Sequence, residues 1–190
     1  MKTLQKDQYW AYLLLAARVL LAWTLFRYGW AKLTDKQFGV DEKTMNLPLK
    51  DVGLFQLSLY LADQQPFKAF VGVSQLVTAL LLSMNRTALL GAFFSIPIWL
   101  NILLWDMTFM EGFTSAFTFR LSFYLLLTAL LLYQAKSQVS PALLTITSRS
   151  SNPISFPVWT YFLLPLAAIG LEVIGAIPNA LVYYGQLLVK

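Results

Sequence analysis

This sequence contains no cysteine and no histidine among its 190 residues. Their absence excludes disulfides, thiolate zinc sites, iron–sulfur ligation and the usual axial ligands of haem, so we predict no metal site and no cofactor held by the chain alone. Charged residues are also scarce, at 12% of the chain, well below the roughly 25% of a soluble domain. The composition therefore argues against a soluble globular protein.

Apolar sequence takes the place of these residues, with 58% hydrophobic residues and a mean hydropathy of +0.62. A helix needs about 17 to 25 mostly apolar residues to cross a bilayer. Five runs meet this length, at residues 9–33, 67–84, 88–107, 117–133 and 158–188. We predict an all-α fold, a polytopic transmembrane helix bundle that forms a single domain over residues 1–190 and lies in a lipid bilayer.

The basic residues between the runs set the predicted orientation. One side of the membrane receives Lys2, Lys6, Arg86, Lys136 and Arg149 against the single acid Asp7, whereas the other side carries acids and bases together. Lys and Arg accumulate in cytoplasmic loops. We therefore predict an N-terminus inside and a C-terminus outside, in the cytoplasmic (inner) membrane of a bacterium.

The longest connection is the predicted outer loop, residues 34–66. Within it, residues 51–62 are rich in Leu and Phe, and Asp51 is placed to cap a short helix. We expect this helix to lie along the membrane interface, as a lid or a docking surface.

The last two segments give two further predictions. Residues 134–156 are rich in Ser and Thr, which predicts a solvated loop on the cytoplasmic side. Pro165 and Pro178 fall inside the fifth run, which predicts a kinked or broken helix.

Charges inside the spans are functional candidates, because a charge within a bilayer costs about 2.5–3.5 kcal/mol. They are Arg18, Arg27, Asp106, Arg120 and Glu172. Arg18 shares one helical stripe with Gly29 and, slightly rotated, Lys32, whereas Arg27 points nearly opposite. Glu172 lies near the middle of the fifth run. By depth Arg18 is its best partner, and both a structural ion pair and a proton-handling or ligand-binding carboxyl remain open.

A second group of charges is predicted at the outer boundary of the spans. It either closes the bundle by interfacial ion pairing or binds an anionic ligand or headgroup. Its members are Arg27, Lys32, Asp106, Glu111 and Arg120.

Uncharged polar and aromatic side chains complete the pattern. Gln75, Ser74 and Thr78, with Asn101 on the third run, are predicted to hydrogen-bond between helices or to line a site. Most tryptophans and several tyrosines, Trp99 among them, are predicted to form an aromatic belt at the membrane surfaces. No nucleotide-binding loop and no nucleophile with its base is present, and the net charge of +5 suits anionic lipid rather than nucleic acid.

The first span carries Arg18 followed by Phe-Arg-Tyr-Gly-Trp-Ala-Lys-Leu at residues 26–33, which resembles the arginine, glycine and lysine pattern of DoxX-like membrane proteins. The hairpin at residues 80–91 is similar to that family's connection between its second and third spans. The resemblance covers residues 9–133. It implies a four-helix membrane bundle associated with quinone-linked or thiol-redox systems, with a fifth C-terminal span as an addition. Gln75 departs from this pattern, because it stands where many relatives carry a glutamate.

We therefore expect a membrane subunit or accessory protein of a redox-linked system that binds a quinone-like or lipid-like molecule within its bundle, beside Arg18 and Glu172. Two alternatives are a small proton-linked transporter and a structural or assembly partner that works through another membrane protein or a second copy of the chain. Enzymatic activity is left open.

Overall fold

The computed structural model describes residues 6–110, 114–148 and 157–188, and helices form most of them. The chain divides into two compact units, Met1–Leu144 and Thr145–Lys190, which are treated separately below. The elements in chain order are α1 (Lys6–Leu33), α2 (Glu42–Met45), the 3-10 helix η1 (Leu49–Asp51), α3 (Leu54–Ala62), α4 (Phe67–Ser83), α5 (Ala88–Phe109), α6 (Thr114–Gln134), α7 (Lys136–Thr147) and α8 (Val158–Leu188).

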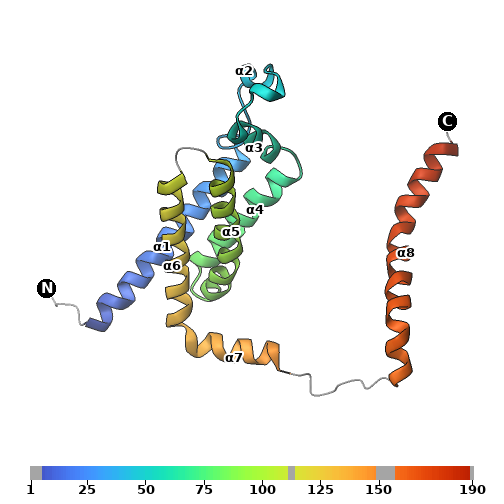
Figure 1. The fold of residues 1–190 in the computed structure, drawn as a ribbon. Helices are drawn as coiled ribbons and strands as arrows, with labels where there is room; N and C mark the ends of the chain where they lie inside the picture. Colours follow the sequence, from blue (N-terminus) through green and yellow to red (C-terminus); the bar gives the residue numbers. More distant parts are fainter. Residues whose placement is uncertain (1–5, 111–113, 149–156, 189–190) are drawn as a thin grey trace. The chain divides into compact units, whose positions relative to one another are not determined.

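Four helices of the first unit, α1, α4, α5 and α6, form a bundle (Figure 1). The α1–α4 pair has the most extensive contact, and α5 packs against both α4 and α6. Two glycines let α1 and α4 approach closely, because a Cβ atom added at Gly29 would lie 2.7 Å from the backbone oxygen of Gly72. Small residues at such crossings are typical of helices packed within membranes.

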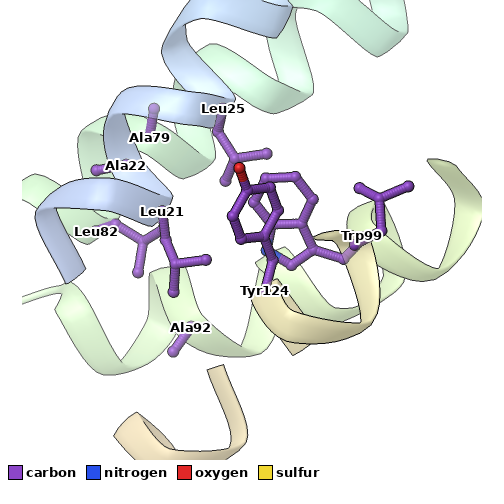
Figure 2. Packing of buried hydrophobic residues seen from close by; sticks show 9 residues of the cluster. Leu21, Ala22, Leu25, Ala79, Leu82, Ala92, Trp99 and Tyr124 are labelled. Carbon is purple, nitrogen blue, oxygen red and sulfur yellow. The ribbon is translucent and has the colours of Figure 1, made fainter. Parts of the chain in front are cut away.

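The core of the bundle lies where these four helices meet. Trp99 is fully buried at its centre, and its ring centroid lies 5.0 Å from that of Tyr124 and 6.4 Å from that of Tyr28. Figure 2 shows the Trp99 and Tyr124 rings against Leu21 and Leu25 of α1. The prediction that Trp99 belongs to a belt at the membrane surface was wrong, since the helix turns its ring inward to fill the bundle.

Four helices in the described residues are long and apolar enough to cross a membrane, spanning Gln8–Leu33, Ala88–Phe109, Ser115–Gln134 and Val158–Gly175. The second predicted span is less simple. Helix α4 qualifies only together with α3, and the two are bent by 79° at the break between them. Large apolar side chains face outward on the bundle, such as Phe70, Leu104 and Phe119, which are 72%, 62% and 78% exposed. Such faces suit lipid and not water.

The two ends of the bundle differ in structure. We call the end that carries residues 34–66 the loop end, and the end that carries the tight α4–α5 turn, residues 84–87, the turn end. At the loop end, Gly39 has a φ of +94° and donates its amide to the Leu59 carbonyl of α3 at 3.2 Å. This bond attaches the long loop to α3.

Three local predictions need correction. Helix α3 begins at Leu54 with Gly53 as its N-cap, and the Gly53 amide donates to the side-chain oxygen of Gln56 at 3.3 Å. Asp51 does not cap this helix, because it ends the separate helix η1. Residues 136–147, predicted as part of a solvated loop, form α7.

Helix α8, in the second unit, is not broken at its prolines. It runs without interruption from Val158 to Leu188 through Pro165 and Pro178. Each proline removes one backbone donor, and the hydrogen bonds of the neighbouring turns are enough to keep the helix continuous.

Candidate functional site

A cavity of about 400 Å³ opens at the loop end of the bundle. All four bundle helices, α3 and the loop at Gln37 and Phe38 contribute to its wall. Its apolar part is built chiefly from aromatic side chains, and four charged side chains stand among them. The charged residues are Arg27, Lys32, Asp106 and Arg120.

Lys32 is the most deeply placed of these charges, with only 4% of its surface exposed. Its Nζ donates a hydrogen bond of 2.9 Å to the side-chain oxygen of Gln37. The ammonium also lies 5.4 Å from the ring centroid of Tyr28 and 5.1 Å from that of Phe38, within the range of cation–π attraction. No carboxylate pairs with it among the described residues. The direct contacts of this buried ammonium are therefore neutral groups, and Asp106 of the same cavity lies beyond ion-pair distance.

Arg120 enters the cavity from α6 and is fixed by two phenols. Its Nε donates to the Tyr124 hydroxyl at 2.8 Å, and one terminal nitrogen donates to the Tyr28 hydroxyl at 3.2 Å. Tyr28 thus contacts both Lys32 and Arg120. Both phenols are neutral, and no carboxylate among the described residues pairs with the guanidinium, so Arg120 keeps the capacity to bind an anion.

Asp106 is the acid of this cavity, half-buried on α5. In the part of the chain that the structure describes, it makes no ion pair. Among the described lining residues, three cations therefore face one carboxylate, which is an excess of positive charge. Glu111, the other acid predicted here, lies outside the described residues.

Helix α3 forms one wall of the cavity through Phe55, Leu59 and Ala62. Its position is secured at the break before α4, where the Lys68 ammonium binds Asp35 of the loop and, at 2.7 Å, Asp63 at the end of α3. Lys68 is buried. This double ion pair joins the loop, α3 and α4, so α3 is held in place as one wall of the cavity.

The structure places the predicted residues at three locations. Arg27, Lys32, Asp106, Arg120 and Asn101 share the cavity at the loop end. Arg18 instead lies toward the turn end, where it donates to the side-chain oxygen of Asn85 at 2.6 Å. Glu172 belongs to the second unit, where it is exposed on α8, and its pairing with Arg18 stays a prediction.

The uncharged polar residues of α4 behave differently from the prediction. Each of Ser74 and Thr78 donates its hydroxyl to a carbonyl of its own helix, at Val71 and Ser74, and not to a neighbouring helix. Gln75 is fully buried, and neither polar atom of its amide has a hydrogen-bond partner within the described residues.

Sequence reasoning missed the neutral groups that hold the cavity cations. Tyr28, which sits beside Arg27 in the sequence, and the loop residues Gln37 and Phe38 gave no signal of their own, because only the folded loop brings them to Lys32. The Lys68 pairs had a weak signal, since Asp63 precedes Lys68 by one helical turn across Pro66.

Fold and cavity together describe an all-helical membrane protein with a cation-lined cavity at one end of its bundle. The chain is similar to the uncharacterized protein YwoB of Bacillus subtilis (strain 168), with 33% identity over 96 residues. These residues are 50% of this chain and 61% of YwoB, so the chain spans about three fifths of that relative. No family model and no solved structure matches the chain.

Proposed function

We propose that this protein binds an amphipathic molecule with an anionic head in the loop-end cavity. The observation that carries the proposal is Lys32, a buried ammonium with no carboxylate partner among the described residues, next to the phenol-held guanidinium of Arg120. A buried charge normally has a partner, because its desolvation is costly. An anionic head placed between Lys32 and Arg120 supplies that partner, and Arg120 offers the planar donors that carboxylate and phosphate groups prefer.

The apolar lining supports a ligand with a hydrophobic part. Phe67 and Trp105 stack at a centroid distance of 6.5 Å, Trp105 also contacts Phe109, and Phe55 faces the same cavity from α3. Flat aromatic surfaces of this kind accept a ring or an acyl chain. The ligand class is therefore lipid-like or quinone-like. Within this class, the excess of positive charge favours a molecule with an acidic head.

We further propose that this binding serves a redox-linked membrane system, as an accessory protein or subunit. The support is the resemblance to DoxX-like proteins, whose pattern residues Arg27 and Lys32 both line the cavity. The expectation that Arg18 and Glu172 line the same ligand site is not part of this proposal, because Arg18 does not line this cavity.

Native mass spectrometry of the protein released from membranes in mild detergent tests the binding proposal. The wild type is expected to retain a bound amphiphile, and Lys32→Met is expected to lose it. Lys36→Met is the matched control, because Lys36 lies four positions further along in the loop after α1, is exposed and does not line this cavity. Equal retention by all three proteins refutes the proposal.

We also propose that the cavity faces the outside of a bacterial cytoplasmic membrane, with the N-terminus inside. The support is the excess of Lys and Arg predicted on the cytoplasmic side. Because the chain has no cysteine, single-cysteine variants report orientation cleanly. Lys36→Cys in intact cells is expected to react with a membrane-impermeant maleimide, and Lys136→Cys only after lysis; the reverse pattern contradicts this orientation.

A further inference from the structure

A second hollow lies on a different face of the bundle, between α1 and α4. It has a volume of about 500 Å³, and it shares no lining residue with the loop-end cavity. Most of its lining is apolar. The polar lining residues are Arg18 and Ser83, which both lie toward the turn end.

Arg18 is incompletely satisfied at this position. One terminal nitrogen donates to the neutral amide oxygen of Asn85 at 2.6 Å, whereas the buried Nε has no hydrogen-bond partner in the described part of the chain. No carboxylate pairs with the guanidinium among these residues. This end of the groove therefore offers a positive charge with which an anion can pair.

The rest of the groove is bordered by three aromatic rings of α1. Trp23 stacks on Phe26 at a centroid distance of 5.8 Å, and Phe26 stacks on Trp30 at 6.2 Å. All three rings are substantially exposed, by 57%, 43% and 53%. They form a continuous apolar surface that leads away from Arg18 along the helix.

The length of this surface matches one leaflet of a membrane. Arg18 and Trp30 are separated by twelve positions, or roughly 18 Å at about 1.5 Å per residue. The hydrocarbon of a single leaflet is about 15 Å thick, half of a core of about 30 Å. A molecule with its head at Arg18 therefore has room for one extended acyl chain beside the aromatic rings.

We infer that this groove is a binding site for an anionic phospholipid, with the phosphate at Arg18 and one acyl chain along Trp23, Phe26 and Trp30. The site is separate from the loop-end cavity. Charge complementarity selects the occupant, because the guanidinium binds a phosphate through several donors at once. Arg18 bonds Asn85 in the turn between α4 and α5, so the head lies at the turn-end surface of the membrane and not at the depth that the sequence predicted for Arg18. The lipid therefore belongs to the leaflet at the turn end of the bundle.

The test compares the retention of phosphatidylglycerol and phosphatidylcholine by the full chain in native mass spectrometry, after equilibration with equal amounts of both lipids. The wild type is expected to prefer phosphatidylglycerol. Arg18→Gln is expected to lower that preference roughly fivefold, the effect of one basic residue near an anionic surface. Arg18→Lys is expected to fall between them, because it keeps the charge and loses the planar donors.

Two further variants make the result specific. Lys136→Gln removes the same charge from α7, outside the groove, and is expected to keep the wild-type preference. Val19→Trp fills the groove beside Arg18 and is expected to lower retention of both lipids. Thermal unfolding confirms that each variant is folded.

The inference is overturned if Arg18→Gln keeps the wild-type preference, or if Lys136→Gln loses as much as Arg18→Gln. It is also overturned if Val19→Trp retains both lipids as the wild type does, which is the result expected when the retained lipids bind elsewhere on the chain. Arg18→Gln is expected to lower the preference by the same factor when Lys32→Met is also present, so the failure of this site and the failure of the loop-end cavity are distinguishable.

Discussion

Replacing Lys32 by methionine separates a binding role from a structural one. Methionine keeps most of the length of the side chain, removes the charge and remains able to contact the rings of Tyr28 and Phe38. The two roles predict opposite patterns. A ligand-binding cation adds little to the stability of the empty fold, whereas a structural cation stabilises it.

The structure allows the effect on stability to be estimated. Burial of an ammonium away from water costs several kcal/mol even after the protein relaxes around it. Against this stand one hydrogen bond to Gln37, worth about 1.5 kcal/mol for a charged donor, and cation–π contacts with Tyr28 and Phe38 at about 0.5–1 kcal/mol each. These contributions nearly cancel, so we expect Lys32→Met to change the free energy of unfolding by no more than about 1 kcal/mol.

The effect on binding is expected to be large. The lost charge-assisted hydrogen bond to an anionic head corresponds to about 1.5–3 kcal/mol, or roughly a tenfold to hundredfold weaker affinity. Unfolding in detergent and titration with an anionic amphiphile measure the two quantities on the same samples. A loss of stability above about 3 kcal/mol, the size seen when a buried ion pair is broken, with unchanged binding refutes the reasoning and makes Lys32 structural.

Three other predictions address the fold around the two sites. Gly29→Ala places a methyl group 2.7 Å from the backbone of α4, and we expect a loss of about 1–3 kcal/mol in thermal unfolding, whereas Gly53→Ala meets only an ordinary contact and is expected to be nearly neutral; equal effects contradict the close crossing. Lys68→Met removes both ion pairs at the break before α4, and amide hydrogen exchange of α3 is expected to accelerate with little change in the bundle helices; uniform exchange contradicts this role. The Thr44 hydroxyl and amide hydrogen-bond the Asp41 carboxylate and lower its pKa, so the cap of α2 contributes fully above the ordinary carboxyl pKa and is lost as the pH falls through the lowered folded value. Thr44→Val is expected to raise the Asp41 pKa in an NMR titration, and an unchanged value contradicts the assignment.

The sequence predicted the membrane-crossing helices well, because long apolar runs reflect one dominant constraint, the satisfaction of backbone hydrogen bonds in hydrocarbon. Four of the predicted spans coincide with helices long enough to cross. The second predicted span falls on α4, which is shorter than the others and reaches crossing length only with α3. Hydropathy does not predict the angle between these two helices, since α3 and α4 are both apolar.

The candidate site was predictable in its charges and not in its neutral groups. Arg27, Lys32 and Arg120 stand out because cations within spans are rare, and helix geometry alone places Arg18 apart from Arg27. The role of Trp99 was not predictable in this way, since tryptophan suits both an interface and a core. Phe38 and Gln37 reach Lys32 only through the fold of a long loop, which local sequence does not determine.

The most direct test of the central claim is an experimental structure of the protein in lipid nanodiscs, with attention to the loop-end cavity. We expect elongated density among Phe55, Phe67 and Trp105, with its head within hydrogen-bond distance of the Lys32 ammonium and the Arg120 guanidinium. A cavity in which Asp106 has moved to pair with Lys32, without a bound molecule, contradicts the account and makes these charges part of the bundle's own packing.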